Sequence, residues 1–198
     1  MTNETAITLK GSTEIVSEFF TYSINSILFL RGIYPPENFR VSKQYGLSLW
    51  LTTDTGLETY LTQILEQIKD WLSNGVIKSL VAVISSCDTT EPLERWVFEV
   101  ETDQSYVEDP SKVAYEKDVR RSIQNIMRQI SASTSFLPLL EDACVFDLLV
   151  YTDNDVEIPM KWNESDPCYI SSSTEVRLRS FTTRVHKVAT TVSYKSEF

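Results

Sequence analysis

Two stretches in the first half of the chain repeat apolar residues every three or four positions, as one face of a helix does. The first opens at Ser12, which we predict as its N-cap, and ends at Gly32. The second begins after Thr53 or Asp54, either of which can cap it, and stops at Asn74. Because a stripe of this kind usually packs against a core, we expect both helices to bury their apolar faces.

A third periodic stretch covers residues 110–131, and its polar face has a distinct composition. That face carries arginines and glutamines, among them Arg128 and Gln129. A basic, amide-bearing face is either solvated, which is the usual case, or a docking surface. The pattern predicts the helix and leaves both roles of its polar face open.

Extended segments are predicted from two other patterns. Residues 76–84 form an almost continuous apolar run, typical of a central strand covered on both faces. Residues 93–101 alternate apolar and polar side chains, which indicates a half-exposed strand, and a short loop joins the two as a hairpin. A further strand is predicted at residues 144–151, and residues 39–51 suggest two short extended pieces broken at Gly46. We therefore predict an α+β domain with three helices on an antiparallel sheet.

Residues 171–194 are rich in β-branched side chains and favour strand, but their apolar positions change parity twice. The apolar residues stand on even positions, then on odd ones, then on even ones again: Val176 and Leu178, Phe181 and Val185, and finally Val188, Val192 and Tyr194. A strand that faces one core keeps a single parity. The stretch is therefore a terminal hairpin with a bend or bulge, or a segment able to pair in more than one way.

The preceding residues, 152–173, are polar and irregular, and a loop of this length is uncommon in a compact domain unless it is functional or disordered. They nevertheless include several apolar side chains, among them Val156, Trp162 and Tyr169. These are too many for free disorder, so we expect this loop to pack against the domain or against a ligand.

Length and composition are those of an ordinary soluble domain. The chain has 198 residues, of which 42% are hydrophobic and 23% charged, and we expect one domain over residues 1–198. No apolar run reaches the length of a membrane span, and the N-terminus lacks the apolar core of a signal peptide, so we expect an intracellular protein. The three cysteines form no paired motif and are predicted to be reduced.

The formal net charge of −10 argues against nucleic acid as the main ligand, because affinity for phosphates comes largely from Lys and Arg. Residues 175–195 reverse the balance, with five basic residues and one acid. Such a basic arm can lie across its own acidic domain or reach an acidic partner, or it can simply protect a strand edge from aggregation.

The sequence contains no motif that favours catalysis. The single histidine, His186, would have to serve any histidine-dependent triad, and no glycine-rich phosphate-binding motif is present. Asp153 and Asp155 flank an asparagine in a turn signal, where such side chains cap backbone groups. We predict no catalytic residue, no metal site and no cofactor, and we expect a domain that binds a peptide.

Seven stretches of the chain are similar to the HORMA-domain family, and in particular to its spindle-checkpoint branch. They are GSTEIVSEFF, INSILFLRGIYP, QIKDWL, LERWVF, IMRQISASTSFLPLLE, FDLLVYTD and EVRLRSFTTRVHKV. They occur in the family's order and cover the chain from about Ile7 to Tyr194. The resemblance implies a flexible segment at residues 1–10, a core at 11–151 and a mobile C-terminal β "safety belt" at 152–198.

The resemblance also implies a two-state switch and the residues that serve it. In the open state the belt pairs at one sheet edge; in the closed state it moves to the other side, and a partner peptide adds a strand where the belt passes over it. The implied peptide-binding strand comprises Phe146, Asp147, Leu148, Leu149, Val150 and Tyr151. The implied belt residues are Trp162, Phe181, Val185, His186, Val188 and Tyr194.

The partners implied by the resemblance are those of the mitotic spindle assembly checkpoint. They are peptides of the checkpoint scaffold, mitotic arrest deficient protein one, and of the activator of the anaphase-promoting complex, whose ubiquitin ligase is thereby inhibited. Open and closed copies would dimerise through the third helix, and the same surface would take a closed-state adaptor that delivers the protein to an AAA+ remodelling ATPase. This implied interface comprises Arg128, Gln129, Phe136 and Arg179.

The resemblance implies a location in the nucleus, at the kinetochore and in the cytoplasm. A second role within the family stays open, as an adaptor subunit for a translesion polymerase or for the meiotic chromosome axis.

Overall fold

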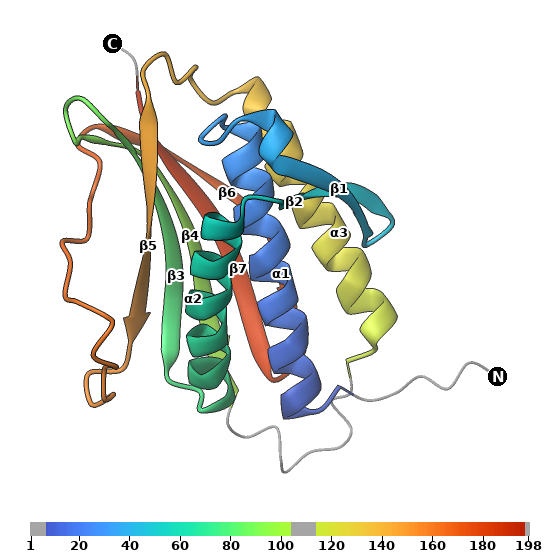
Figure 1. Cartoon of the computed structure of the whole chain (residues 1–198). Coiled ribbons are helices and arrows are strands. Elements are labelled where there is room, and N and C mark those ends of the chain that lie inside the picture. The colour runs from blue at the N-terminus through green and yellow to red at the C-terminus, as the bar shows by residue number, and fades with distance from the viewer. Residues whose placement is uncertain (1–6, 104–113, 197–198) are drawn as a thin grey trace.

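The computed structural model describes residues 7–103 and 114–196. Its three long helices are α1 (Leu9–Leu30), α2 (Thr55–Ser73) and α3 (Glu116–Ala132), and single 3-10 turns follow at Pro36–Asn38 and Ser133–Ser135. The helices lie together on one face of a sheet, with α1 in the middle (Figure 1).

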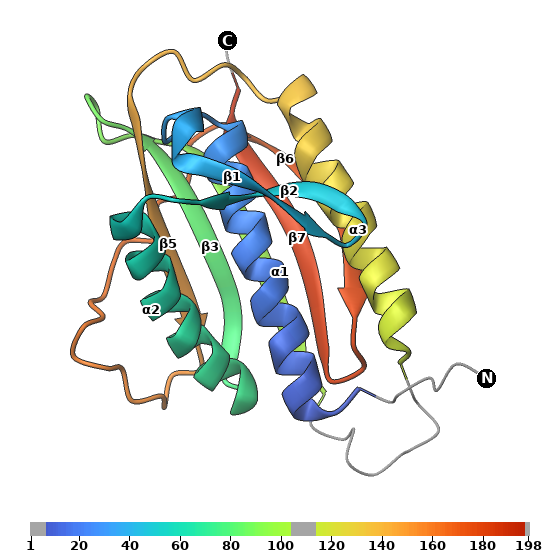
Figure 2. The same cartoon turned by 45° about the vertical axis from the view of Figure 1, so that its right-hand side comes forward.

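The main sheet has five antiparallel strands in the order β5-β3-β4-β7-β6. The strands are β3 (Ile77–Ser86), β4 (Pro92–Thr102), β5 (Cys144–Thr152), β6 (Ser173–Thr182) and β7 (His186–Lys195). A separate hairpin of β1 (Phe39–Gln44) and β2 (Leu47–Thr52) crosses α1 on the side away from the sheet (Figure 2). The predicted fold class is confirmed, including the hairpin of the two middle strands and the break at Gly46.

The helix boundaries depart from the predictions at two N-termini. The prediction that Ser12 caps the first helix is wrong: Thr8 is the cap, its Oγ1 accepts from the backbone N–H of Gly11, and Ser12 is buried one turn inside. Asp54 caps α2 as one of the two predicted candidates, through an acceptor bond from Leu57. Helix α3 begins at Glu116, later than predicted, and the predicted first turn at residues 110–113 lies outside the described residues.

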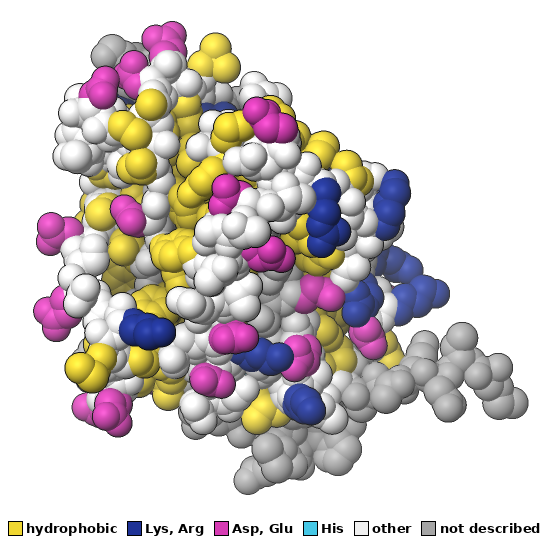
Figure 3. Space-filling model, in the orientation of Figure 1, with side chains coloured by type: hydrophobic (Ala, Val, Ile, Leu, Met, Phe, Trp, Pro, Cys, Tyr) yellow, Lys and Arg dark blue, Asp and Glu magenta, His cyan; other side chains and the backbone are white. Residues whose placement is uncertain are grey.

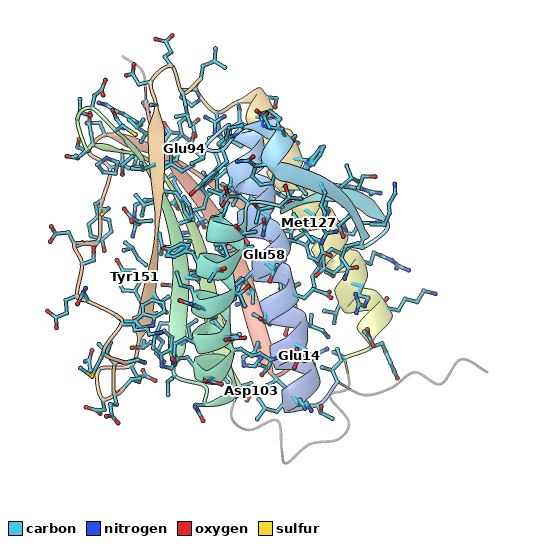
Figure 4. The ribbon with its side chains drawn as sticks, in the orientation of Figure 1. Glu14, Glu58, Glu94, Asp103, Met127 and Tyr151 are labelled. Carbon is cyan, nitrogen blue, oxygen red and sulfur yellow. The ribbon has the colours of Figure 1, made fainter. Side chains whose placement is uncertain are left out.

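The core lies between the helices and the near face of the sheet. Phe19 and Phe20 of α1 pack their rings against Phe98 of β4, with centroids 5.8 and 5.7 Å apart. Trp96 is fully buried beside them, and Met127 joins α3 to α1 by accepting a hydrogen bond from Ser23 (Figure 4). We call the opposite face of the sheet, which carries no helix, its outer face.

A buried ion pair ties the end of α1 to the sheet. The guanidinium of Arg31 donates twice to Glu94 of β4, and the side chains of the pair are only 6% and 2% exposed. Arg31 also donates to the carbonyl oxygen of Pro138, and the carboxylate of Glu94 accepts from the Trp96 indole (Figure 4). Every charged group of this pair is therefore both paired and hydrogen-bonded, as burial requires.

Strands β6 and β7 form a terminal hairpin, which explains both parity changes of the arm. A register shift between Arg177 and Ser180 accounts for the first, since a bulge moves the following residues to the other face. The turn between the two strands, at residues 183–185, accounts for the second. The observed arrangement is the first of the two alternatives, a terminal hairpin with a bulge, and the ability of the arm to pair in more than one way stays a prediction.

Candidate functional site

One edge of the main sheet is open. Strand β5 pairs with β3 along its inner side, and no strand among residues 7–103 and 114–196 pairs with its outer side. Half of its N–H and C=O groups therefore point away from the sheet. The six residues predicted as a peptide-binding strand all lie in β5, and Tyr151 of this strand is labelled in Figure 4.

The side chains of β5 divide between the two faces of the sheet. Phe146, Leu148 and Val150 stand opposite Ile84, Ala82 and Leu80 of β3, so they face the helices. Asp147, Leu149 and Tyr151 alternate with them and face outward. An added strand would thus contact an apolar row on one face and a mixed row on the other.

Two tyrosines frame the helix side of this edge. The ring of Phe146 lies 6.1 Å from that of Tyr34 and 5.9 Å from that of Tyr60 on α2, both in edge-to-face geometry. Burial, and next the charge of Asp147, raise the pKa of Tyr60 above its ordinary value. A hydrogen bond with the backbone of Leu148 opposes this shift, so the Tyr60 hydroxyl already lies against the backbone of β5.

Residues 153–172, which we call the crossing segment, leave the end of β5 and run back alongside it (Figure 1). Their start is fixed by the Asp153 N–H, which donates to the carbonyl of Val76. Trp162 then packs edge-to-face on Trp71 of α2, with centroids 5.0 Å apart. Figure 3 shows apolar side chains reaching the surface on this side of the molecule. The expectation that the segment packs on the domain is confirmed.

The terminal hairpin occupies the opposite side of the sheet, where β7 pairs with β4. This is the arrangement expected for the closed state, with the arm away from the peptide-binding strand. Five predicted belt residues therefore lie far from β5 and anchor the hairpin instead: Phe181, Val185, His186, Val188 and Tyr194. Trp162 alone among the six stands on the β5 side.

A buried hydrogen-bond node holds the hairpin against the helices. His186 Nε2 lies 3.1 Å from the carbonyl oxygen of Leu72, so this nitrogen carries the proton and donates it. Nδ1, 2.6 Å from Ser12 Oγ, then accepts from that hydroxyl, and Thr183 Oγ1 contacts the same oxygen. Burial lowers the pKa of His186, which keeps the ring neutral. The node thus joins the first turn of α1, the end of α2 and the turn of the hairpin.

The predicted interface residues are brought together at α3. The Gln129 side chain accepts a hydrogen bond from the backbone of Arg179 in β6, while Arg128 projects to solvent one position earlier. Phe136 is 40% exposed and its ring lies 6.2 Å from that of Tyr194. The surface therefore combines side chains of α3 with side chains of the docked hairpin.

Two clefts adjoin α2, and the second borders the start of the crossing segment. One, of about 290 Å³, is lined by α1, α2 and β2; the other, of about 630 Å³, separates the end of α2 from residues 155–157. Neither contains His186, and no group of three or more metal-ligating side chains occurs in the part of the chain that the structure describes. No helix of that part is long and apolar enough to cross a membrane.

Several residues of the site carry no distinguishing signal in the sequence. Tyr34 and Tyr60 stand within a loop and a helix stripe, and only the tertiary fold brings them to β5. Ser12 precedes an apolar stripe, a position that predicts a cap rather than a buried hydrogen-bond partner of the hairpin. No local signal distinguishes such residues, since each role depends on a neighbour far along the chain.

The sequence matches the family model of the HORMA domain over residues 12–186. The chain belongs to the HORMA domain family. It is 53% identical over 193 residues to the mitotic spindle assembly checkpoint protein MAD2A of Dictyostelium discoideum, covering 98% of this chain and 95% of that protein.

Solved structures confirm the HORMA fold. A chain of the mitotic checkpoint complex crystal structure matches with a TM-score of 0.86 and 42% identity, covering 94% of this HORMA domain and 99% of that chain. Caenorhabditis elegans HTP-2 bound to the HTP-3 closure motif 1 matches with a TM-score of 0.78 over 97% of this chain and 89% of that one. At 15% identity, the second match supports the fold alone.

Proposed function

We propose that this protein is a mitotic spindle assembly checkpoint switch that traps a short partner peptide as an added strand along β5, beneath the crossing segment. The observation that carries this proposal is the open edge of β5 with the terminal hairpin docked on the opposite side of the sheet. The identity to a checkpoint relative over nearly the whole chain supports this role over the other adaptor roles in the family.

Strand addition suits the physics of this edge. Main-chain hydrogen bonds supply affinity that depends little on the peptide's sequence. Specificity comes from every second side chain of the peptide, which must fit against the apolar row of Phe146, Leu148 and Val150. A ligand enclosed by a covalently continuous segment cannot leave until that segment moves, so the barrier appears in the dissociation rate. The function needs binding and conformational change, and it uses no catalytic group.

The proposed partners follow from the family. The ligands are peptides of the checkpoint scaffold, mitotic arrest deficient protein one, and of the activator of the anaphase-promoting complex, whose sequestration delays anaphase. The exposed Arg128 and the neighbouring Gln129, Phe136 and Arg179 form the surface for a second copy in the open state, and for the adaptor that recruits the remodelling ATPase. The proposed locations are the nucleus, the kinetochore and the cytoplasm.

A peptide with selectively methylated backbone amides tests strand addition on the intact protein. The probe is a fluorescein-labelled peptide of mitotic arrest deficient protein one, prepared in two forms with N-methyl groups on alternate residues. In an added strand, only every second N–H faces β5. One methylated form should therefore lose binding, whereas the other should bind like the unmodified peptide. Equal loss or equal retention in the two forms would contradict strand addition.

A further inference from the structure

Arg95 is a buried cation on the outer face of the sheet. It stands in β4 between Val83 of β3 and Ser193 of β7, and only 9% of it is exposed. Its Nε is buried and makes no hydrogen bond, and no ion pair involves Arg95 in the part of the chain the structure covers. An arginine that is mostly buried, with a buried Nε that makes no hydrogen bond and without a carboxylate partner, is uncommon and calls for another source of stabilisation.

The ring of Tyr169 provides that stabilisation. The guanidinium carbon of Arg95 lies 4.7 Å from the ring centroid, within the range of a cation–π contact. Tyr169 belongs to the crossing segment, and 70% of it is exposed, so it is not held there by burial in a core. The contact therefore joins a segment without regular structure to the middle of the sheet.

The two ring contacts of the crossing segment lie on opposite faces of the sheet. Trp162 packs on Trp71 of α2, which is on the helix side, whereas Tyr169 packs on Arg95, which is on the outer face. Trp162 and Tyr169 are seven positions apart in sequence, a span of roughly 25 Å at full extension. Because Asp147 of β5 pairs with Val83, the strand partner of Arg95, the segment passes around the β5 edge between its two contacts.

We propose that Arg95 and Tyr169 form a clasp that fastens the crossing segment on the outer face and so closes the enclosure around the β5 edge. This proposal rests on the proposed peptide-trapping function and deepens it. Trp71 and Trp162 form the other fastening. Arg95 and Tyr169 act as positioning residues: they hold the segment closed, and the ligand contacts β5.

The clasp is tested by dissociation of the fluorescein-labelled peptide of mitotic arrest deficient protein one, chased with unlabelled peptide. Tyr169→Leu removes the aromatic face and Arg95→Met removes the charge while keeping the apolar stem. Each should speed dissociation about fivefold, the factor expected for a partly desolvated cation–π contact. Tyr169→Phe keeps the ring and should dissociate slowly, as the unsubstituted protein does.

The double variant separates a clasp from two unrelated structural effects. If the residues act on each other, Tyr169→Leu adds nothing in the Arg95→Met background. Multiplication of the two effects, or single variants with unchanged dissociation rates, would overturn the clasp while leaving peptide trapping intact. Since Tyr169 is largely exposed, its substitution is expected to leave the melting temperature within about 2 °C of the original value.

A second readout needs no peptide. Trypsin cleaves after Lys161, an exposed residue of the crossing segment, and opening of the clasp should make this cut several-fold faster in Tyr169→Leu than in Tyr169→Phe. If the protein fails to bind the peptide at all, the proposed function fails, and the cleavage rates still decide the clasp. Equal cleavage of the two variants would overturn it.

Discussion

The side-chain oxygen of Gln129 in α3 accepts a hydrogen bond of 2.8 Å from the backbone N–H of Arg179 in β6. Arg179 lies in the bulge of the terminal hairpin, where the strand register shifts and a backbone N–H is left for a side chain to satisfy. The contact can form only while the hairpin is docked beside α3. A partner that recognises this surface therefore recognises the docked state.

Arg128→Glu tests whether this surface mediates self-association. Arg128 is exposed and lies away from β5, so the substitution should abolish dimer formation in sedimentation velocity while leaving peptide affinity within about twofold. Arg121→Glu, at another exposed position of the same helix, is the matched charge control. Loss of peptide binding in Arg128→Glu would show that the helix is structural at this position, and equal loss of dimer in both variants would indicate a nonspecific charge effect.

Thr190→Asp should oppose docking of the hairpin. Thr190 is 1% exposed and stands opposite Phe98 on the helix face, so a carboxylate there would be buried among apolar groups. The expected loss of stability is at least about 3 kcal/mol. A phosphate at Thr190 would meet the same barrier, so we expect phosphorylation of this residue to bias the switch away from the docked hairpin.

Thr191→Asp is the control for that variant, because Thr191 faces outward and pairs with Val97 and Arg177. Urea unfolding and peptide binding should change little in this variant. Equal effects of the two aspartates on the midpoint of unfolding, or a hairpin that NMR shows still docked in Thr190→Asp, would contradict this role for the burial of Thr190.

Acid should weaken the hairpin through His186, the one histidine in the sequence. Burial lowers its pKa in the folded protein, with the Leu72 carbonyl opposing the shift. Above about pH 6.5 the ring is neutral in both folded and unfolded chains and adds no pH dependence. Below that pH, His186 binds a proton in the unfolded chain but not in the folded protein. The free energy of unfolding therefore falls with pH until the lowered pKa of the folded protein is reached.

Urea unfolding between pH 7 and pH 5 measures this effect, and His186→Gln supplies the comparison. The variant should be less stable at pH 7 because the node with Ser12 is altered, and its stability should depend less on pH in this window. A pH slope that is identical in the two proteins would assign the dependence to other groups.

Removal of one partner of the Arg31–Glu94 pair should be costly. Arg31→Met leaves the Glu94 carboxylate buried without its cation, and the expected loss is about 3–5 kcal/mol by urea unfolding. The double variant Arg31→Met, Glu94→Leu removes both charges and should recover part of this loss. The two side chains do not act as a pair if Glu94→Leu lowers the free energy of unfolding as much in the Arg31→Met background as in the original protein.

The regular elements were predictable because each one depends mainly on local pattern. The N-cap of α2 at Asp54 depends on the chemistry of that side chain and of the next three residues. The end of α1 before Gly32, where φ is +66°, depends on the backbone freedom of glycine. The alternation in β4 and the parity changes of the arm likewise correspond to observed strands and to a bulge.

The arrangement around the site was less predictable, because it depends on pairing between distant residues. The β-branched arm fits either sheet edge by pattern, and only the structure places β7 against β4. The interpretation of Ser12 as a cap was wrong because its actual partners are 171 and 174 residues away. In the sequence, Tyr169 is one of several apolar residues in an irregular loop, and nothing near it predicts its contact with Arg95.

The terminal hairpin is the last regular element of the chain, and this order has a consequence for synthesis on the ribosome. Strands β3, β4 and β5 and the three long helices emerge first, so the nascent sheet β5-β3-β4 presents two open edges, the outer sides of β5 and β4, before β6 and β7 are made. The hairpin then meets two competing acceptors of similar chemistry. In the proposed two-state switch, conversion from one edge to the other breaks a full strand ladder, so we expect a newly made molecule to keep its first arrangement until that ladder opens.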